Sequence, residues 1–157
     1  EGDALARYGN NMQPMDEEQR AGDPTRLFIY PFAQTRAALL AISHGTPDAH
    51  LGFKQRFVNP ATGGYPMPTM ATFMQLLPAG FQGKVYRSTD STVYSVVEGR
   101  GIARVGDAEF HFGPRDVFVA PSWQPVQLAA LEDATLFSYS DRPVQDALGL
   151  WREERTA

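Results

Sequence analysis

The succession of short apolar runs after Pro68 limits the fold of this chain more than any other feature. The runs are rich in β-branched and aromatic residues, and turn-forming residues separate them at intervals of about eight to twelve positions, as in a sandwich or barrel. The predicted strands are residues 70–77, 85–88, 93–97, 102–105, 109–112, 117–120, 126–131 and 135–140. The sequence therefore predicts an all-β fold.

The turns between the predicted strands have suitable chemistry. Gly106-Asp107 fits a two-residue hairpin loop, and Gly113-Pro114-Arg115-Asp116 precedes an apolar strand that ends at Pro121. In the second turn we expect the Asp116 carboxylate to accept hydrogen bonds from nearby backbone amides.

The segments on either side of this core have other patterns. Residues 1–26 are polar and interrupted by Gly and Pro, and residues 59–64 form a turn cluster. Apolar residues at helical spacing are Phe32, Leu39, Leu40 and Ile42 before the strands, and Val144, Leu148 and Trp151 after them, with Asp141 as the expected N-cap of the second helix. We predict a connector with one amphipathic helix over residues 1–64, a barrel over residues 65–142, and a C-terminal helix or tail over residues 143–157.

Composition excludes several function classes. The net charge is -4 and no dense basic run is present, which argues against a nucleic-acid partner. No apolar run approaches the roughly 20 residues needed to span a bilayer, so we expect a cytoplasmic protein without a membrane partner. The chain has no cysteine, so a metal site would need His, Asp or Glu.

The order of the strands and turns resembles the double-stranded β-helix, the small jelly-roll barrel called a cupin. Cupins have a first motif with a glycine, a His-x-His pair and a later glycine, and a second motif with a Pro-Gly-Asp turn, a strand and a third histidine. Here Gly80 and Gly99 frame Tyr86-Arg87-Ser88, and the second motif covers residues 113–121 and places the third ligand position at Val126. The frame is complete, but all three histidines are replaced.

Longer motifs make the resemblance more specific. From about Gly2 to Glu154 the chain resembles the second half of bicupin gentisate 1,2-dioxygenases. The motifs are Asn59-Pro60-Ala61-Thr62-Gly63-Gly64, Pro68-Thr69, Gln75-Leu76-Leu77-Pro78, Tyr86-Arg87-Ser88-Thr89-Asp90, Val97-Glu98-Gly99-Arg100-Gly101, Phe112-Gly113-Pro114, Pro121-Ser122-Trp123-Gln124-Pro125 and Ser140-Asp141-Arg142-Pro143-Val144.

The resemblance implies a division of labour between two cupins. In that family the N-terminal cupin carries a three-histidine ferrous site that opens the ring of gentisate with molecular oxygen. It follows that Fe(II) is expected in an upstream cupin, which is the partner of this C-terminal one. The resemblance also implies a homo-oligomer, a tetramer, with packing and assembly as the role of this half. An apolar patch at residues 27–32 is expected to contribute an interface.

The residues themselves support a metal-free C-terminal half. Tyr86, Ser88 and Val126 offer a phenol, an alcohol and a hydrocarbon where an iron site needs imidazole or carboxylate donors. We therefore expect no catalytic residue, no metal and no cofactor in this chain. Gln75, Trp123 and Gln124 are candidates for the lining of a residual pocket.

The three histidines lack metal-ligand spacing. His44 is expected near a helix C-terminus, His50 in a polar loop, and His111 as a hydrogen-bonded structural residue on its strand.

Two alternatives remain open at this point. One is a stand-alone metal-free cupin that binds a small aromatic acid. The other is a self-sufficient dioxygenase with an unusual site at Tyr86, His111 and Asp116. The sequence does not decide whether gentisate, salicylate or a hydroxynaphthoate is the substrate of the whole enzyme.

Overall fold

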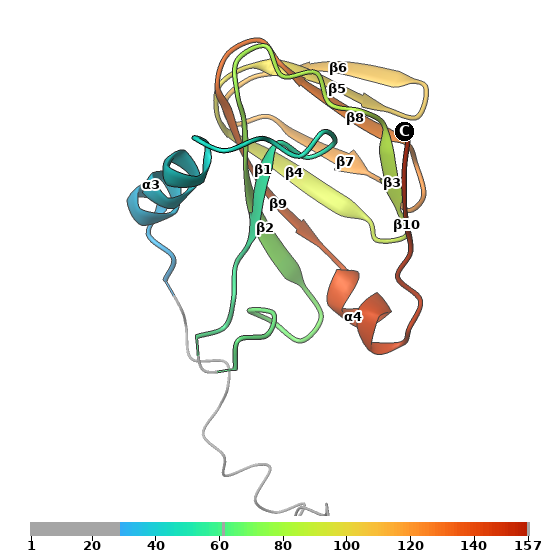
Figure 1. Ribbon diagram of the computed structural model, residues 1–157. Helices are drawn as coiled ribbons and strands as arrows, with labels where there is room; N and C mark the ends of the chain where they lie inside the picture. The colour runs from blue at the N-terminus through green and yellow to red at the C-terminus, as the bar shows by residue number, and fades with distance from the viewer. Residues whose placement is uncertain (1–28, 61, 157) are drawn as a thin grey trace, which may run out of the picture.

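Two antiparallel five-stranded sheets form a barrel in the computed structural model, which describes residues 29–60 and 62–156 (Figure 1). The first sheet has the strand order β1-β2-β9-β4-β7, and the second has the order β10-β3-β8-β5-β6. The strands are β1 (Phe53–Arg56), β2 (Ala71–Leu77), β3 (Tyr86–Ser88), β4 (Thr92–Glu98), β5 (Gly101–Val105), β6 (Ala108–Phe112), β7 (Val117–Ala120), β8 (Val126–Ala130), β9 (Ala134–Ser140) and β10 (Glu153–Arg155).

The eight strands predicted from the sequence are β2 to β9, and each begins and ends within one residue of its predicted bounds. Alternation explains this agreement, because Thr92, Tyr94 and Val96 of β4 are buried while the residues between them are partly exposed. The all-β prediction is confirmed.

The core lies between the two sheets and includes stacked aromatic rings. Tyr94 of β4 is 1% exposed, and its ring centroid lies 4.9 Å from that of Phe118 on β7. Phe112 of β6 stacks on the other sheet's Phe118 at 5.8 Å, which joins the two layers. The turn after β4 requires Gly99, since its φ is +80° and a Cβ would lie 2.1 Å from the carbonyl oxygen of Asp133.

Two edge strands were not predicted. β1 has the sequence Phe-Lys-Gln-Arg and pairs with β2, and β10 has the sequence Glu-Glu-Arg and pairs with β3. Neither has the β-branched residues typical of strands, so pairing with a neighbour decides their conformation. Both lie outside residues 65–142. The division of the chain at residues 64 and 142 stays a prediction.

The first predicted helix is confirmed as α3 (Phe32–Ile42), which lies outside the barrel next to β1 and β2 (Figure 1). Its apolar residues, which the sequence places at helical spacing, do not share one buried face. Leu39 alone is buried, in a cluster with Phe53 and Met74, because the short edge of the sheet covers only a narrow strip of the helix. The residues that stay exposed are Phe32, Leu40 and Ile42.

The C-terminal helix α4 (Arg142–Ala147) is shorter than its apolar spacing predicts. Gly149 has a φ of +67° just after the helix, so Trp151 leaves the helix and leads into β10. Asp141 is at the N-cap but makes no capping bond. Its carboxylate accepts hydrogen bonds from the Ser91 backbone N–H at 2.8 Å and from the Gln145 side chain at 3.0 Å.

Some sequence predictions lie outside the described residues. These are the polar connector at residues 1–26 and the first two positions of the apolar patch at residues 27–32. Within residues 29–60 and 62–156, no helix is long and apolar enough to cross a membrane.

Candidate functional site

The three positions predicted to correspond to cupin ligands come together inside the barrel. Tyr86 and Ser88 are two residues apart on β3, and the Tyr86 hydroxyl lies 3.0 Å from the Ser88 hydroxyl. Val126 on β8 is the register partner of Tyr86 and is 4% exposed. The motif spacing therefore identified neighbouring positions.

The donor set at these positions does not fit an iron ion. Tyr86 and Ser88 bond to each other, and Val126 has no donor atom. Burial raises the pKa of the Tyr86 phenol, and the charges of Asp90 and Glu153 raise it further against the opposing Ser88 hydrogen bond and Arg142 charge, so the phenol stays neutral. Among the described residues, no three His, Asp or Glu side chains group closely enough to hold a metal.

A cavity of about 200 Å³ lies beside Tyr86, where β1 of one sheet approaches β10 of the other. Its walls combine aromatic rings with charged side chains. The lining residues are Leu51, Lys54, Arg56, Phe73, Tyr86, Asp90, Arg142, Trp151, Glu153 and Arg155. Four of them are cationic and two are carboxylates, and two further carboxylates, Asp48 and Asp146, make ion pairs with Arg155 and Arg142 from outside the lining.

Asp90 is the buried carboxylate of this cavity and is 7% exposed. Burial alone raises the pKa of Asp90. Hydrogen bonds from Ser140, Ser88 and Trp151, together with the charge of Lys54, outweigh that effect and hold the pKa below its ordinary value. The Trp151 indole N–H donates to its Oδ1 at 3.0 Å. The side chain is therefore an anion already engaged with several donors.

Lys54 reaches the same cavity from β1. Its ammonium lies 4.6 Å from the ring centroid of Phe73 and 5.6 Å from that of Tyr94. Burial lowers the pKa of Lys54 to about 8, with the charge of Asp90 opposing the change and that of Arg142 adding to it. The ammonium is thus charged at neutral pH at a cost in solvation.

Arg142 of α4 forms another wall. Its guanidinium carbon lies 3.7 Å from the ring centroid of Trp151, which fixes the guanidinium over the indole face. The Nε of Arg142 is buried and has no hydrogen-bond partner, although a carboxylate oxygen of Asp146 lies 3.5 Å away. The Tyr65 hydroxyl donates to that same oxygen of Asp146.

The residues predicted to line the pocket lie elsewhere. Gln75 is fully buried and donates from Nε2 to the Leu51 carbonyl oxygen at 2.6 Å. Trp123 is 39% exposed, with the Arg87 guanidinium 4.7 Å from its ring, and Gln124 is exposed in the turn before β8. None of the three lines the cavity beside Tyr86.

The alternative catalytic set is not assembled. The His111 side chain is 73% exposed, lies 3.7 Å from a Glu109 carboxylate oxygen, and does not line the cavity. The Asp116 carboxylate accepts the Gly113 N–H at 2.8 Å within its turn, as predicted. Of Tyr86, His111 and Asp116, only Tyr86 lines the cavity.

The other two histidines occupy the predicted environments. His44 follows the C-terminus of α3. His50 lies in the loop before β1, where its Nε2 is 2.9 Å from the Thr156 carbonyl oxygen. Neither lines the cavity.

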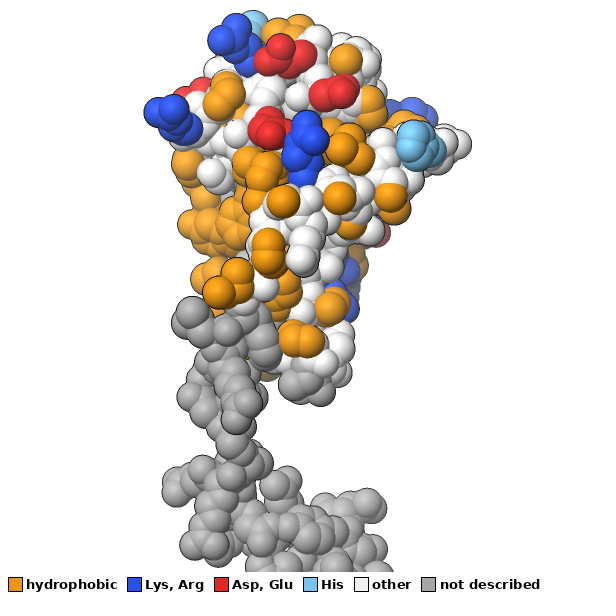
Figure 2. Space-filling view, turned by 90° about the vertical axis from the view of Figure 1, so that its left-hand side faces the viewer, with side chains coloured by type: hydrophobic (Ala, Val, Ile, Leu, Met, Phe, Trp, Pro, Cys, Tyr) orange, Lys and Arg blue, Asp and Glu red, His pale blue; other side chains and the backbone are white. Residues whose placement is uncertain are grey.

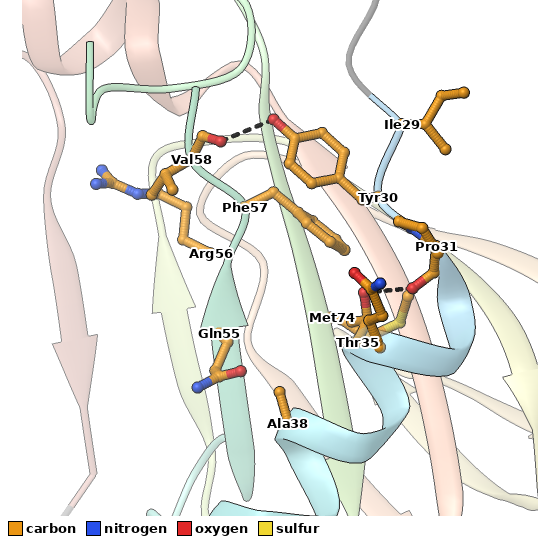
Figure 3. A pocket seen from close by; sticks show the side chains of 11 residues that line it. Ile29, Tyr30, Pro31, Thr35, Ala38, Gln55, Arg56, Phe57, Val58 and Met74 are labelled. Atoms are coloured by element: carbon orange, nitrogen blue, oxygen red, sulfur yellow. Dashed lines mark hydrogen bonds between the residues drawn. The ribbon is translucent and has the colours of Figure 1, made fainter. Parts of the chain in front are cut away.

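A second hollow, of about 310 Å³, lies between α3 and β1 (Figure 3). The Tyr30 ring packs 4.8 Å from that of Phe57, and its hydroxyl donates to the Val58 carbonyl oxygen at 2.7 Å. Ile29 is 79% exposed beside it. Figure 2 faces this side of the molecule and shows many hydrophobic side chains on its surface.

Comparison with known proteins finds similarity to proteins named as dioxygenases. No protein-family model matches it. Gentisate 1,2 dioxygenase 1 of Aquipseudomonas alcaligenes is 49% identical over 155 residues, which cover 98% of this chain and 44% of that protein. A 5-aminosalicylate 1,2-dioxygenase of a Comamonas species is 36% identical over 86% of this chain and 37% of that protein.

Solved structures agree with the sequence relatives. A salicylate 1,2-dioxygenase of Pseudoaminobacter salicylatoxidans, with gentisate adducts, matches with a TM-score of 0.76 and 27% identity over 99% of this chain and 44% of that one. The cupin fold expected from the motifs is confirmed. The chain spans less than half the length of the relatives it matches, and it matches their C-terminal part.

Proposed function

Because this chain belongs to the gentisate 1,2-dioxygenase family and corresponds to its C-terminal cupin region, we propose that it is the structural cupin of a ring-cleaving dioxygenase. The observation that carries the proposal is the complete cupin frame with Tyr86, Ser88 and Val126 at the ligand positions. These side chains pack and bond to each other. They therefore act in the enzyme through the stability of the barrel.

The chemistry of the whole enzyme belongs to an upstream cupin in this proposal. That cupin would hold Fe(II) with three histidines, and the iron would supply oxygen chemistry at the ring of a hydroxy-aromatic acid. Relatives named for gentisate and 5-aminosalicylate share this C-terminal region, as does one named for salicylate. The residues that choose among these acids would accordingly lie outside this barrel.

The face that carries α3 is proposed as the contact surface of this cupin within the assembled enzyme. Its exposed apolar residues are Ile29, Phe32, Leu40, Ile42 and Val58. Of these, Ile29 and Val58 line the hollow between α3 and β1 (Figure 3). An exposed apolar surface of this kind favours an interface. A tetramer, with the upstream cupin as the immediate neighbour, is the proposed assembly.

The test uses the complete subunit, with Tyr86→Phe and Ser88→Ala combined. Removing both hydroxyls from the former ligand positions should leave oxygen uptake per bound iron within about threefold of the unmodified enzyme, because a lost catalytic group costs far more. Elemental analysis should find about one iron per complete subunit, and none bound stoichiometrically by the 157-residue chain alone.

Two outcomes would contradict the proposal. One is a hundredfold lower rate per iron in the double variant with its assembly unchanged. The other is stoichiometric iron in the 157-residue chain that is lost when Tyr86 is replaced.

A further inference from the structure

We propose that the cavity beside Tyr86 is a binding site for a small carboxylate, held between the Lys54 ammonium and the Arg142 guanidinium. The site shares Tyr86 with the proposed former metal-ligand positions, but its charged groups are cations from β1 and α4. It stands on the geometry of the cavity and does not depend on the proposed function.

The charges of the cavity are only partly compensated. Arg155 makes ion pairs with Glu153 at 3.3 Å and with Asp48 at 2.8 Å, so its charge is neutralised. The Asp90 carboxylate accepts hydrogen bonds from the Trp151 indole and from the hydroxyls of Ser88 and Ser140. Among the described residues, no carboxylate lies within ion-pair distance of Lys54. Asp90 acts on it through its charge alone, and the Lys54 ammonium lies over the rings of Phe73 and Tyr94.

The Arg142 guanidinium is paired only loosely. Its Nε lies 3.5 Å from a carboxylate oxygen of Asp146, which also accepts the Tyr65 hydroxyl, and the buried Nε–H makes no hydrogen bond. An unsatisfied buried donor is destabilising, and more so when the donor is charged. Stacking on Trp151 already holds the guanidinium plane in place. A ligand oxygen at this wall would meet a charged donor that is oriented in advance.

The size and walls of the cavity select the ligand class. A volume of about 200 Å³ is below the roughly 300 to 1,000 Å³ of sites for drug-sized molecules, so only a small molecule fits. A guanidinium fork matches the planar geometry of a carboxylate. The rings of Phe73, Tyr86 and Trp151 line the remaining space and suit an apolar or planar body attached to that carboxylate.

Binding should depend on pH through Lys54. The charged and titratable groups that face it in the cavity are Asp90, Tyr86, Glu153, Arg56, Arg142 and Arg155. A bound anion stabilises the ammonium and raises its pKa, whereas deprotonation removes one of the two cations that hold the ligand. The affinity should therefore fall as the pH rises above about 8.

Calorimetric titration of the 157-residue chain with benzoate tests the site, in a buffer without carboxylate or phosphate. Saturable binding at low ionic strength is expected. Lys54→Met should weaken it by about tenfold or more, as should Arg142→Gln, because each removes a charge from a partly desolvated site. Arg87→Gln is the matched control, since Arg87 also lies over an indole, that of Trp123, but outside the cavity. The affinity of the Arg87→Gln protein for benzoate should stay within about twofold of that of the unmodified chain.

Benzamide, which is neutral, and phosphate, which is tetrahedral, test whether the site recognises the charge and the planar shape of a carboxylate. Benzamide has the same ring without the charge and should bind at least about tenfold more weakly. Equal binding of benzamide would overturn the charge-based site, and binding of phosphate in place of benzoate and acetate would overturn the carboxylate assignment. Unchanged benzoate affinity in Lys54→Met, or no saturation by about 10 mM benzoate, would also refute the proposal.

Discussion

Exchanging Lys54 for Met removes a charge from the barrel interior and keeps an unbranched side chain of similar shape. The ammonium lies near the rings of Phe73 and Tyr94, and its pKa falls from 10.5 to about 8 on folding. At about 1.4 kcal/mol for each tenfold change in proton affinity, this lowering corresponds to about 3 kcal/mol of the free energy of unfolding. Lys54 is half-buried, so water in the open cavity reduces the effect. We expect Lys54→Met to be about 2 to 3 kcal/mol more stable at pH 7.

The pH dependence of the free energy of unfolding shows independently that the Lys54 charge destabilises the folded chain. Below pH 8 Lys54 is protonated in both the folded and the unfolded chain, and the solvation cost in the folded state is complete. Between about pH 8 and 10.5 the folded chain releases this proton first, so the stability of the unmodified protein rises. Burial raises the pKa values of Tyr86 and Tyr94, which lowers stability above about pH 10 in both proteins and cancels in their difference.

Urea unfolding at several pH values between 7 and 10 measures both effects. The advantage of Lys54→Met should shrink steadily above pH 8. Lys84→Met is the control, because Lys84 is exposed and its loss should change stability by at most about 0.5 kcal/mol. A Lys54→Met protein that is less stable than the unmodified chain at pH 7 would refute the reasoning. A difference that does not change with pH would refute it as well.

Two further changes test the core and the Asp90 network. Phe118→Ala should lower the free energy of unfolding by about 3 to 5 kcal/mol in urea, because it removes a buried ring stacked on Tyr94, whereas Phe110→Ala, at a 41% exposed ring, should cost much less. Similar costs for the two changes would contradict this account of the core. Trp151→Phe removes the indole N–H bonded to Asp90 and should cost about 1 to 3 kcal/mol at neutral pH. The same change should raise the Asp90 pKa, which NMR can follow. The loss of stability should become smaller in acid, because the Asp90 carboxylate of the unmodified protein is then protonated as well. An unaltered Asp90 pKa would argue against the hydrogen bond.

The strands of the barrel were predictable because each carries its own signal. Alternating apolar residues and tight turns mark β2 to β9, and the spacing of Gly80, Tyr86 and Gly99 indicated three positions that lie close together in the barrel. Local pattern sufficed for strands such as β4 because alternate residues face the core.

The walls of the cavity were not predictable in the same way. Lys54, Glu153 and Arg155 lie on edge strands whose sequences are mostly charged, and only pairing with β2 and β3 makes them strands. The apolar spacing predicted that Trp151 lies on the C-terminal helix, but α4 ends at Ala147. Trp123 has a φ of +63° in its turn and packs with Arg87 on the surface. The sequence hinted at a strand with an inward-facing cation only through Lys54, which directly follows the apolar Phe53.

The position of β1 and β10 at the sheet edges decides how this barrel can be transplanted. The Arg155 guanidinium donates to the Asp48 carboxylate at 2.8 Å, and the carbonyl oxygen of the loop residue Ala49 accepts the Lys84 N–H at 2.8 Å. These bonds hold the segment before β1 against the sheet that contains β10 and β3. A chimera cut at residue 65 would leave behind β1 and Lys54. The recipient would carry an open strand edge at β2 and a pocket wall inherited from a different parent. Exchanges of this cupin between relatives should therefore carry the stretch from residue 48 onward as one cassette.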